Sequence, residues 1–128
     1  MPDQEVTSEL KQFIRTFIQS VEQLEILLLL HSQRAREWNA REVFQIIQSN
    51  EQSIARRLGQ FVEWGFLAAS HAQPATYRYA AQSEEMNRRV EEVARLYRIR
   101  PVLLVEIIFK PDLDPAQSFA DAFRFKKP

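Results

Sequence analysis

Residues 39–67, which read NAREVFQIIQSNEQSIARRLGQFVEWGFL, hold the start signals of two successive helices. Asn39 with Glu42 three residues later has the pattern of a capping box, in which each side chain accepts a hydrogen bond from a free backbone N–H of the first turn. Ser49 with Gln52 repeats that pattern. The segment therefore predicts a short helix, a tight turn and a second helix at about residues 50–64.

The second predicted helix has one apolar side and a clear end. Its apolar residues recur at three- and four-residue steps, which places them on one helical face: Ile54, Leu58, Phe61 and Val62. Gly65 follows them and is typical of the left-handed residue just past a helix end. Residues 66–70 and 76–80 then have strand character, with Pro74 marking a turn between them, so we expect a hairpin.

The segments on either side are predicted to be helical. One covers about residues 7–31, and a cap pattern at Ser20 leaves open whether it is one helix or two. Another starts at Ser83 and stops or kinks before Pro101, because proline disfavours a helical residue before it. Asp114 followed by proline predicts the start of a last short helix. The expected fold class is mainly α with a small β-hairpin.

The composition excludes several classes of site. The 128 residues contain no cysteine, two histidines and two glycines, so neither a thiolate or His-rich metal site nor a glycine-rich phosphate loop is expected. No nucleophile–base pair can be recognised either, so we expect no enzymatic activity and no cofactor. The longest apolar run, 26–30, is too short to span a bilayer, and residues 1–10 do not form a signal peptide. A cytoplasmic protein that does not contact membranes is predicted.

The order of these elements resembles a winged helix-turn-helix domain over about residues 21–82. Within it, Glu63-Trp64-Gly65-Phe66-Leu67 is similar to the end of the recognition helix in bacterial MarR-type regulators. The resemblance implies a transcriptional regulator that binds double-stranded DNA as a homodimer, with flanking N- and C-terminal helices for dimerisation. It also implies that a small-molecule effector would bind between a dimerisation helix and the winged domain.

This resemblance divides the chain into three expected parts. Residues 1–20 would be an N-terminal dimerisation helix, residues 21–82 the winged helix-turn-helix domain, and residues 83–128 a C-terminal helical extension. Phenylalanines near both ends are expected to bury the shared surface of the dimer: Phe13, Phe17, Phe119 and Phe123.

The polar residues of the second capped helix are the candidates for reading DNA, since a major groove admits one helix. They are Asn50, Gln52, Ser53, Arg56, Arg57 and Gln60. The hairpin adds three candidates for the minor groove or for phosphates, namely His71, Gln73 and Arg78. Three arginines of the preceding loop and helix are candidates for phosphate contacts, namely Arg34, Arg36 and Arg41.

The charge balance supports an alternative function. Net charge over the chain is zero, and the arginines of the winged region are matched by an equal number of glutamates. A winged-helix module that binds protein and not DNA is therefore the second hypothesis. Trp38 and Trp64 are expected to pack in the core or at its rim, and Glu106 either pairs with a nearby arginine or faces water.

Overall fold

The computed structural model describes residues 6–109, and these form six helices and one two-stranded antiparallel hairpin. In chain order the elements are α1 (Ser8–Phe17), α2 (Val21–Ser32), α3 (Ala40–Ile47), α4 (Glu51–Glu63), β1 (Leu67–Ala69), β2 (Tyr77–Tyr79), α5 (Glu84–Ile99) and α6 (Pro101–Phe109). The predicted fold class, mainly α with a small hairpin, is confirmed. The helix expected after Asp114, with Phe119 and Phe123, lies outside the described residues.

Two helix breaks follow from local sequence. The corner between α1 and α2 is closed by Ser20, whose hydroxyl accepts from the Gln23 N–H at 3.1 Å, and by the Gln23 side chain, which accepts from the Gln19 N–H at 2.8 Å. These contacts separate the segment 7–31 into two helices. The break between α5 and α6 falls at Arg100, directly before the proline that restricts it.

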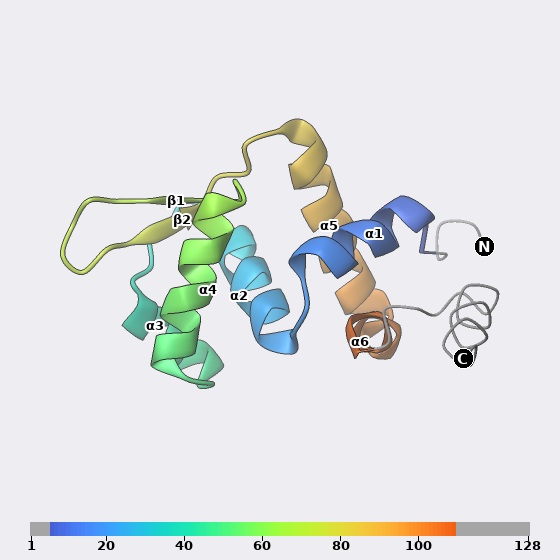
Figure 1. Cartoon of the computed structure of the whole chain (residues 1–128), viewed down its shortest axis with the longest axis horizontal. Coiled ribbons are helices and arrows are strands. Elements are labelled where there is room, and N and C mark those ends of the chain that lie inside the picture. The colour runs from blue at the N-terminus through green and yellow to red at the C-terminus, as the bar shows by residue number, and fades with distance from the viewer. Residues whose placement is uncertain (1–5, 110–128) are drawn as a thin grey trace, which may run out of the picture.

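The central helix of the core is α2. Four of its apolar residues are fully buried although they point in different directions: Leu24, Ile26, Leu27 and Leu30. The helix contacts α3, α4, α5 and β2. Figure 1 shows α3, α4 and the hairpin on one side of α2, and α1, α5 and α6 on the other. None of the helices within residues 6–109 is long and apolar enough to cross a membrane.

The hairpin pairs Leu67 with Tyr79 and is anchored to the loop before α3. The backbone N–H of Trp38 donates to the Tyr77 carbonyl at 2.8 Å, and the Tyr77 N–H donates back at 2.7 Å. This bridge adds a third short strand position, which the sequence patterns do not reveal because it lies in a polar loop. Tyr79 is buried while Arg78 between the tyrosines is exposed, the alternation expected of a strand with one face on the core.

The phenylalanines of α1 pack inside the chain. The Phe13 and Phe17 rings lie 5.8 and 5.1 Å from that of Phe66 at the base of the hairpin, and Phe17 is 5.4 Å from Trp64. Within residues 6–109 these two rings are therefore taken up by an aromatic cluster that joins α1 to the end of α4. The expectation that Phe13 lies on a dimer surface is wrong, because this side chain is buried within the chain, while Phe17 is only partly buried.

One apolar surface remains exposed near the end of the described chain. Val102 of α6 is 70% exposed, and Ile99 and Phe109 are also exposed. Glu106 on the same helix faces water and makes no ion pair within residues 6–109, which settles the alternative left open by the sequence.

Candidate nucleic-acid interface

The helix predicted to read DNA, α4, is capped one residue later than the sequence indicates. Asn50 is its N-cap, and the Asn50 side chain accepts a hydrogen bond from the backbone N–H of Ser53 at 2.8 Å. Ser49 instead donates its hydroxyl to Glu22 of α2. The expected capping pair of Ser49 and Gln52 is therefore wrong, although α4 itself lies where it is predicted.

The buried side of α4 fixes the direction of its polar side. Three apolar residues are fully buried, namely Ile54, Leu58 and Phe61. The opposite side carries a row at three- and four-residue steps, here called the α4 ridge, which consists of Gln52, Arg56, Gly59 and Glu63. Gln52 and Arg56 of the predicted reading residues are exposed on this ridge. Arg56 is its central and only basic member.

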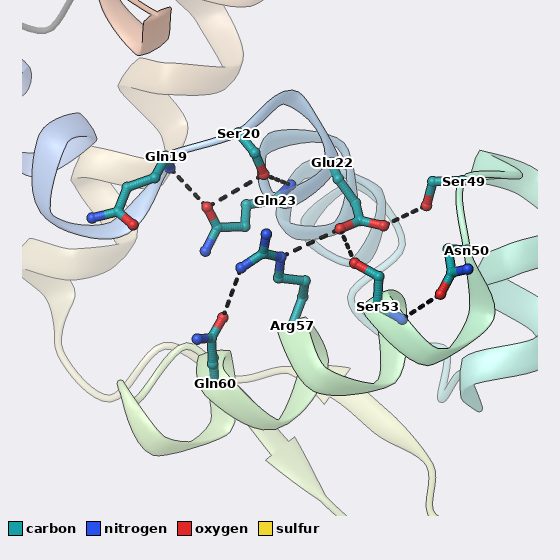
Figure 2. A network of polar contacts seen from close by, with 9 residues as sticks. All are labelled: Gln19, Ser20, Glu22, Gln23, Ser49, Asn50, Ser53, Arg57 and Gln60. Atoms are coloured by element: carbon teal, nitrogen blue, oxygen red, sulfur yellow. Dashed lines mark hydrogen bonds and ion pairs between the residues drawn. The ribbon is translucent and has the colours of Figure 1, made fainter.

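Ser53, Arg57 and Gln60 lie on the flank of α4 that faces α2, whereas Asn50 caps the start of the helix (Figure 2). Arg57 donates from Nε to Glu22 at 3.3 Å and from Nη1 to Gln60 at 3.4 Å, and the Ser53 hydroxyl donates to the same carboxylate. The Arg57 side chain is only 25% exposed. Of the two adjacent arginines, Arg57 is therefore held within the chain by Glu22 of α2.

Two of the arginines suggested for phosphate contact are also engaged within the chain. The Arg34 guanidinium donates to Glu91 of α5 at 2.9 Å. The Arg36 guanidinium lies 3.6 Å from the centre of the Trp38 ring, the geometry of a cation–π contact. Trp38 is buried and Trp64 is half-buried, as the packing interpretation predicts.

Arg41 stands beside the start of α4 and remains accessible. It lies 3.6 Å from Glu51, but both side chains are largely exposed, and ion pairs of this kind are weak. Arg56 and Arg78 make neither an ion pair nor an aromatic stack with any residue of the described range 6–109. The free positive charge of the winged region is thus concentrated on the α4 ridge and on the hairpin.

The hairpin loop is ordered by one serine and presents its polar residues outward. The Ser70 hydroxyl accepts from the Ala72 N–H at 3.2 Å and from the Thr76 N–H at 3.0 Å. His71 and Gln73 are exposed in the loop, and Arg78 is exposed on β2. All three predicted wing residues therefore have accessible side chains.

A cluster at the end of α2 ties the winged region to α5. The His31 ring lies edge-on to Tyr79 at 4.9 Å, and its Nε2 is 3.0 Å from the Arg34 guanidinium. The Tyr79 hydroxyl donates to Asn87 at 2.7 Å, and burial raises the pKa of Tyr79 to about 12. Burial, followed by the Arg34 charge, lowers the pKa of His31, although Glu91 opposes this shift. The neutral imidazole is therefore the form that the native state favours.

Acidification is expected to weaken the fold through His31. The unfolded chain protonates this histidine near its ordinary pKa of 6.5, whereas the native state resists protonation until a lower pH. The unfolded state thus binds more protons in this interval, so the free energy of unfolding falls as pH drops below about 6.5. Urea unfolding at pH 7.5 and 5.5 should show the loss. His31→Gln should abolish this pH-dependent loss of stability, whereas His71→Gln on the hairpin should leave it unchanged. If the loss persists in His31→Gln, His31 is not its cause.

Gly59 on the α4 ridge is expected to lower stability without serving any contact inside the described chain. A Cβ at this position would meet nothing within 4 Å. Glycine in a helix interior is about 1 kcal/mol less favourable than alanine. Gly59→Ala should therefore raise the free energy of unfolding by about 1 kcal/mol in urea titrations. A destabilising effect would show that α4 packs differently at this point.

The candidate site combines predicted and unpredicted features. Gln52 and Arg56 are exposed on the α4 ridge and Arg41 is exposed beside Glu51 at the start of α4, while Asn50 and Arg57 make contacts within the chain. The sequence does not reveal that Glu22 contacts the α4 region, because an acidic residue in the first turn of a helix is usually explained by the helix dipole. Among residues 6–109, no three His, Cys, Asp or Glu side chains gather as metal ligands would.

Comparisons with known proteins agree with this architecture. No protein-family model matches the sequence, and no curated protein matches it. Among solved structures, the chain is similar to a mutant of MarR from E. coli, with a TM-score of 0.52 and 11% sequence identity. The match covers 92% of this chain and 84% of that chain. Six helices and an antiparallel hairpin, arranged in this order, give the chain a MarR-like winged-helix fold.

Proposed function

We propose that the protein is a sequence-specific DNA-binding transcriptional regulator that acts as a homodimer. The observation that carries the proposal is the α4 ridge: a polar helix face with a free arginine at its centre, held outward by three fully buried apolar residues and flanked by a hairpin. This is the arrangement in which a recognition helix enters the major groove while a wing contacts the adjacent backbone.

Within this proposal, α4 supplies the base contacts and the neighbouring elements supply phosphate contacts. Arg56 would form paired hydrogen bonds to guanine, and Gln52 would read adenine. Arg78, His71 and Gln73 of the hairpin and Arg41 of α3 would hold the register on the duplex.

Band-shift titrations on genomic fragments at low salt test the assignment. Wild type should prefer some fragments, and Arg56→Ala should weaken binding to them by about 5- to 150-fold per protomer, the range for loss of one paired base contact of 1–3 kcal/mol. Arg95→Ala is the matched control, since Arg95 is exposed on α5 and the charge change is the same. Equal losses for the two variants, or no preference in wild type, would contradict the proposal.

Dimerisation is proposed to use the exposed apolar surface of α6, in line with the division of the chain into residues 1–20, 21–82 and 83–128. Val102 and Phe109 are exposed seven residues apart on one side of α6, with Glu106 between them, and exposed apolar side chains favour association. Val102→Glu should convert a dimer to a monomer in analytical ultracentrifugation. Ile46→Glu changes a residue of similar exposure on α3 and should leave the dimer intact; a dimer that survives Val102→Glu would overturn this arrangement.

A small-molecule effector is proposed to bind the hollow of about 560 Å³ between α1 and the start of α5. Phe13, Phe17 and Met86 supply an apolar lining, and the volume is that of an ordinary ligand site. Thr16→Trp would fill the hollow. Small aromatic compounds should raise the melting temperature of wild type but not that of Thr16→Trp. Equal shifts in the melting temperature of the two proteins would show that the compounds bind elsewhere.

The alternative function, a winged-helix module that binds protein, is favoured by two features. Glu51 and Glu63 accompany Arg56 on or beside the α4 ridge, and Ile46 of α3 is 60% exposed. Under this alternative, wild type shows no duplex preference. It forms a stoichiometric complex with a partner protein, and Ile46→Glu abolishes that complex.

A further inference from the structure

The carboxylate of Glu22 collects three hydrogen-bond donors from the α4 region (Figure 2). The hydroxyls of Ser49 and Ser53 each lie 2.5 Å from its oxygens, and the Arg57 Nε lies at 3.3 Å. The Glu22 side chain is 15% exposed, so the contacts lie at the edge of the fold and not in its core. One residue of α2 thus binds the turn before α4, its first turn and its second turn together.

These three donors are the kind that would bind a DNA phosphate. Hydroxyls and a guanidinium at the start of a helix are common ligands of phosphate oxygens. Burial acts to raise the pKa of Glu22, but the hydrogen bonds from Ser49, Ser53 and Arg57 outweigh it and hold the pKa below its usual value of 4.5. At neutral pH the donors therefore already face a negative charge that belongs to the protein.

We propose that Glu22 is an affinity-limiting residue: an internal counter-ion that keeps Arg57, Ser49 and Ser53 turned toward α2 and away from the duplex. The inference rests on the proposed DNA binding and specifies which of the two adjacent arginines contacts the duplex. Arg56 and Arg57 are adjacent in sequence, yet Arg56 stands on the α4 ridge and Arg57 on the flank that Glu22 occupies. Only Arg56 of this pair would therefore contact the duplex.

The charge of Glu22 is therefore expected to lower the number of phosphate contacts. Each phosphate neutralised by a basic side chain steepens the dependence of log K on log salt by about 0.9. When Glu22→Gln removes the charge, Arg57 is released to bind one phosphate per protomer. Affinity for any duplex should rise at low salt, and an additional loss of about 3.5-fold per protomer should appear between 50 and 200 mM salt.

The test measures this salt dependence for full-length protein on a duplex of random sequence. Glu22→Gln should steepen the slope by about 0.9 per protomer. The matched control is Glu25→Gln on the same helix, which makes the same charge change but contacts Tyr97 of α5 at 3.5 Å and not α4. Its slope should equal that of wild type. The double variant Glu22→Gln, Arg57→Gln should return to the wild-type slope.

A purely structural role for Glu22 predicts the opposite result. Loss of the contacts would then loosen α4, and Glu22→Gln would bind duplex more weakly with an unchanged slope, which would overturn the inference. Arg57→Gln alone provides a second test that leaves Glu22 and both serine hydroxyls in place. Its slope should match that of wild type, because Arg57 does not touch the duplex while Glu22 is charged; a shallower slope would overturn the inference.

The failure of this inference can be distinguished from failure of the proposed function. If wild type prefers particular sequences but Glu22→Gln leaves the slope unchanged, the regulator proposal stands and the counter-ion role falls. If wild type has no sequence preference but the slopes change as expected, the counter-ion role stands and sequence-specific regulation falls. If no variant binds duplex at low salt, both are refuted.

Discussion

Phe66→Ala is expected to lower the free energy of unfolding by about 3–5 kcal/mol, the largest effect among the substitutions considered. Phe66 is fully buried, and its ring meets Phe13 and Phe17 of α1 and Phe61 of α4, with ring centres 5.1–5.8 Å apart. Alanine removes the shared member of this cluster and leaves a cavity where α1, α4 and the hairpin meet. Small domains are stable by only about 5–15 kcal/mol, so this loss should be a large part of the total free energy of unfolding.

Urea titration followed by far-UV circular dichroism measures this loss. Phe17→Ala is the matched control, because Phe17 belongs to the same cluster but is only partly buried, and it should cost less. A loss below about 1 kcal/mol for Phe66→Ala, far under the range for a buried phenylalanine, would show that α1 does not pack on the winged region as described.

Gly65→Ala is expected to destabilise the protein by about 1–3 kcal/mol through backbone strain. Gly65 has φ of +91°, where an L side chain is strained, and the flexible Gln82 side chain would have to move away from the added Cβ. The residue also ends α4. The Gly65 N–H donates to the Val62 carbonyl at 3.1 Å and the Phe66 N–H donates to the Phe61 carbonyl at 2.9 Å, and these are the two hydrogen bonds of a Schellman motif.

The two glycines of the chain should thus respond to alanine with opposite signs. Gly65→Ala should lower the urea midpoint and Gly59→Ala should raise it, although both substitutions add one methyl group at or near α4. If Gly65→Ala raises the urea midpoint as Gly59→Ala does, the end of α4 is not formed by a left-handed residue at Gly65.

The helices and their ends could be predicted where the signal is local. The capping box of Asn39 and Glu42 is present with both of its hydrogen bonds, and Gly65 ends α4 as its position after an apolar stripe predicts. The cap of α4 could not be predicted in the same way. Ser49 and Asn50 are both good caps, and the choice between them involves Glu22, which is distant in sequence and hydrogen-bonds Ser49.

The same limit applies to the candidate site. Sequence shows that α4 has a polar side, but the adjacent Arg56 and Arg57 are equivalent until α2 is placed beside one of them. The stripe of Phe13 and Phe17 likewise predicts burial correctly and gives no information about the partner surface. In both cases the deciding contact joins residues more than thirty positions apart, where neither periodicity nor capping patterns carry information.

Selection of bound sequences from a random duplex pool tests the central claim most directly, that α4 of a homodimer reads DNA. We expect enrichment of a palindrome whose half-sites are centred about 10–10.5 base pairs apart, or a multiple of that spacing, because each protomer would place one α4 in a major groove on the same face of the duplex. Arg56→Ala should lose conserved guanines within the half-sites. Recovery of the pool without enrichment, or the same motif with Arg56→Ala, would contradict the account.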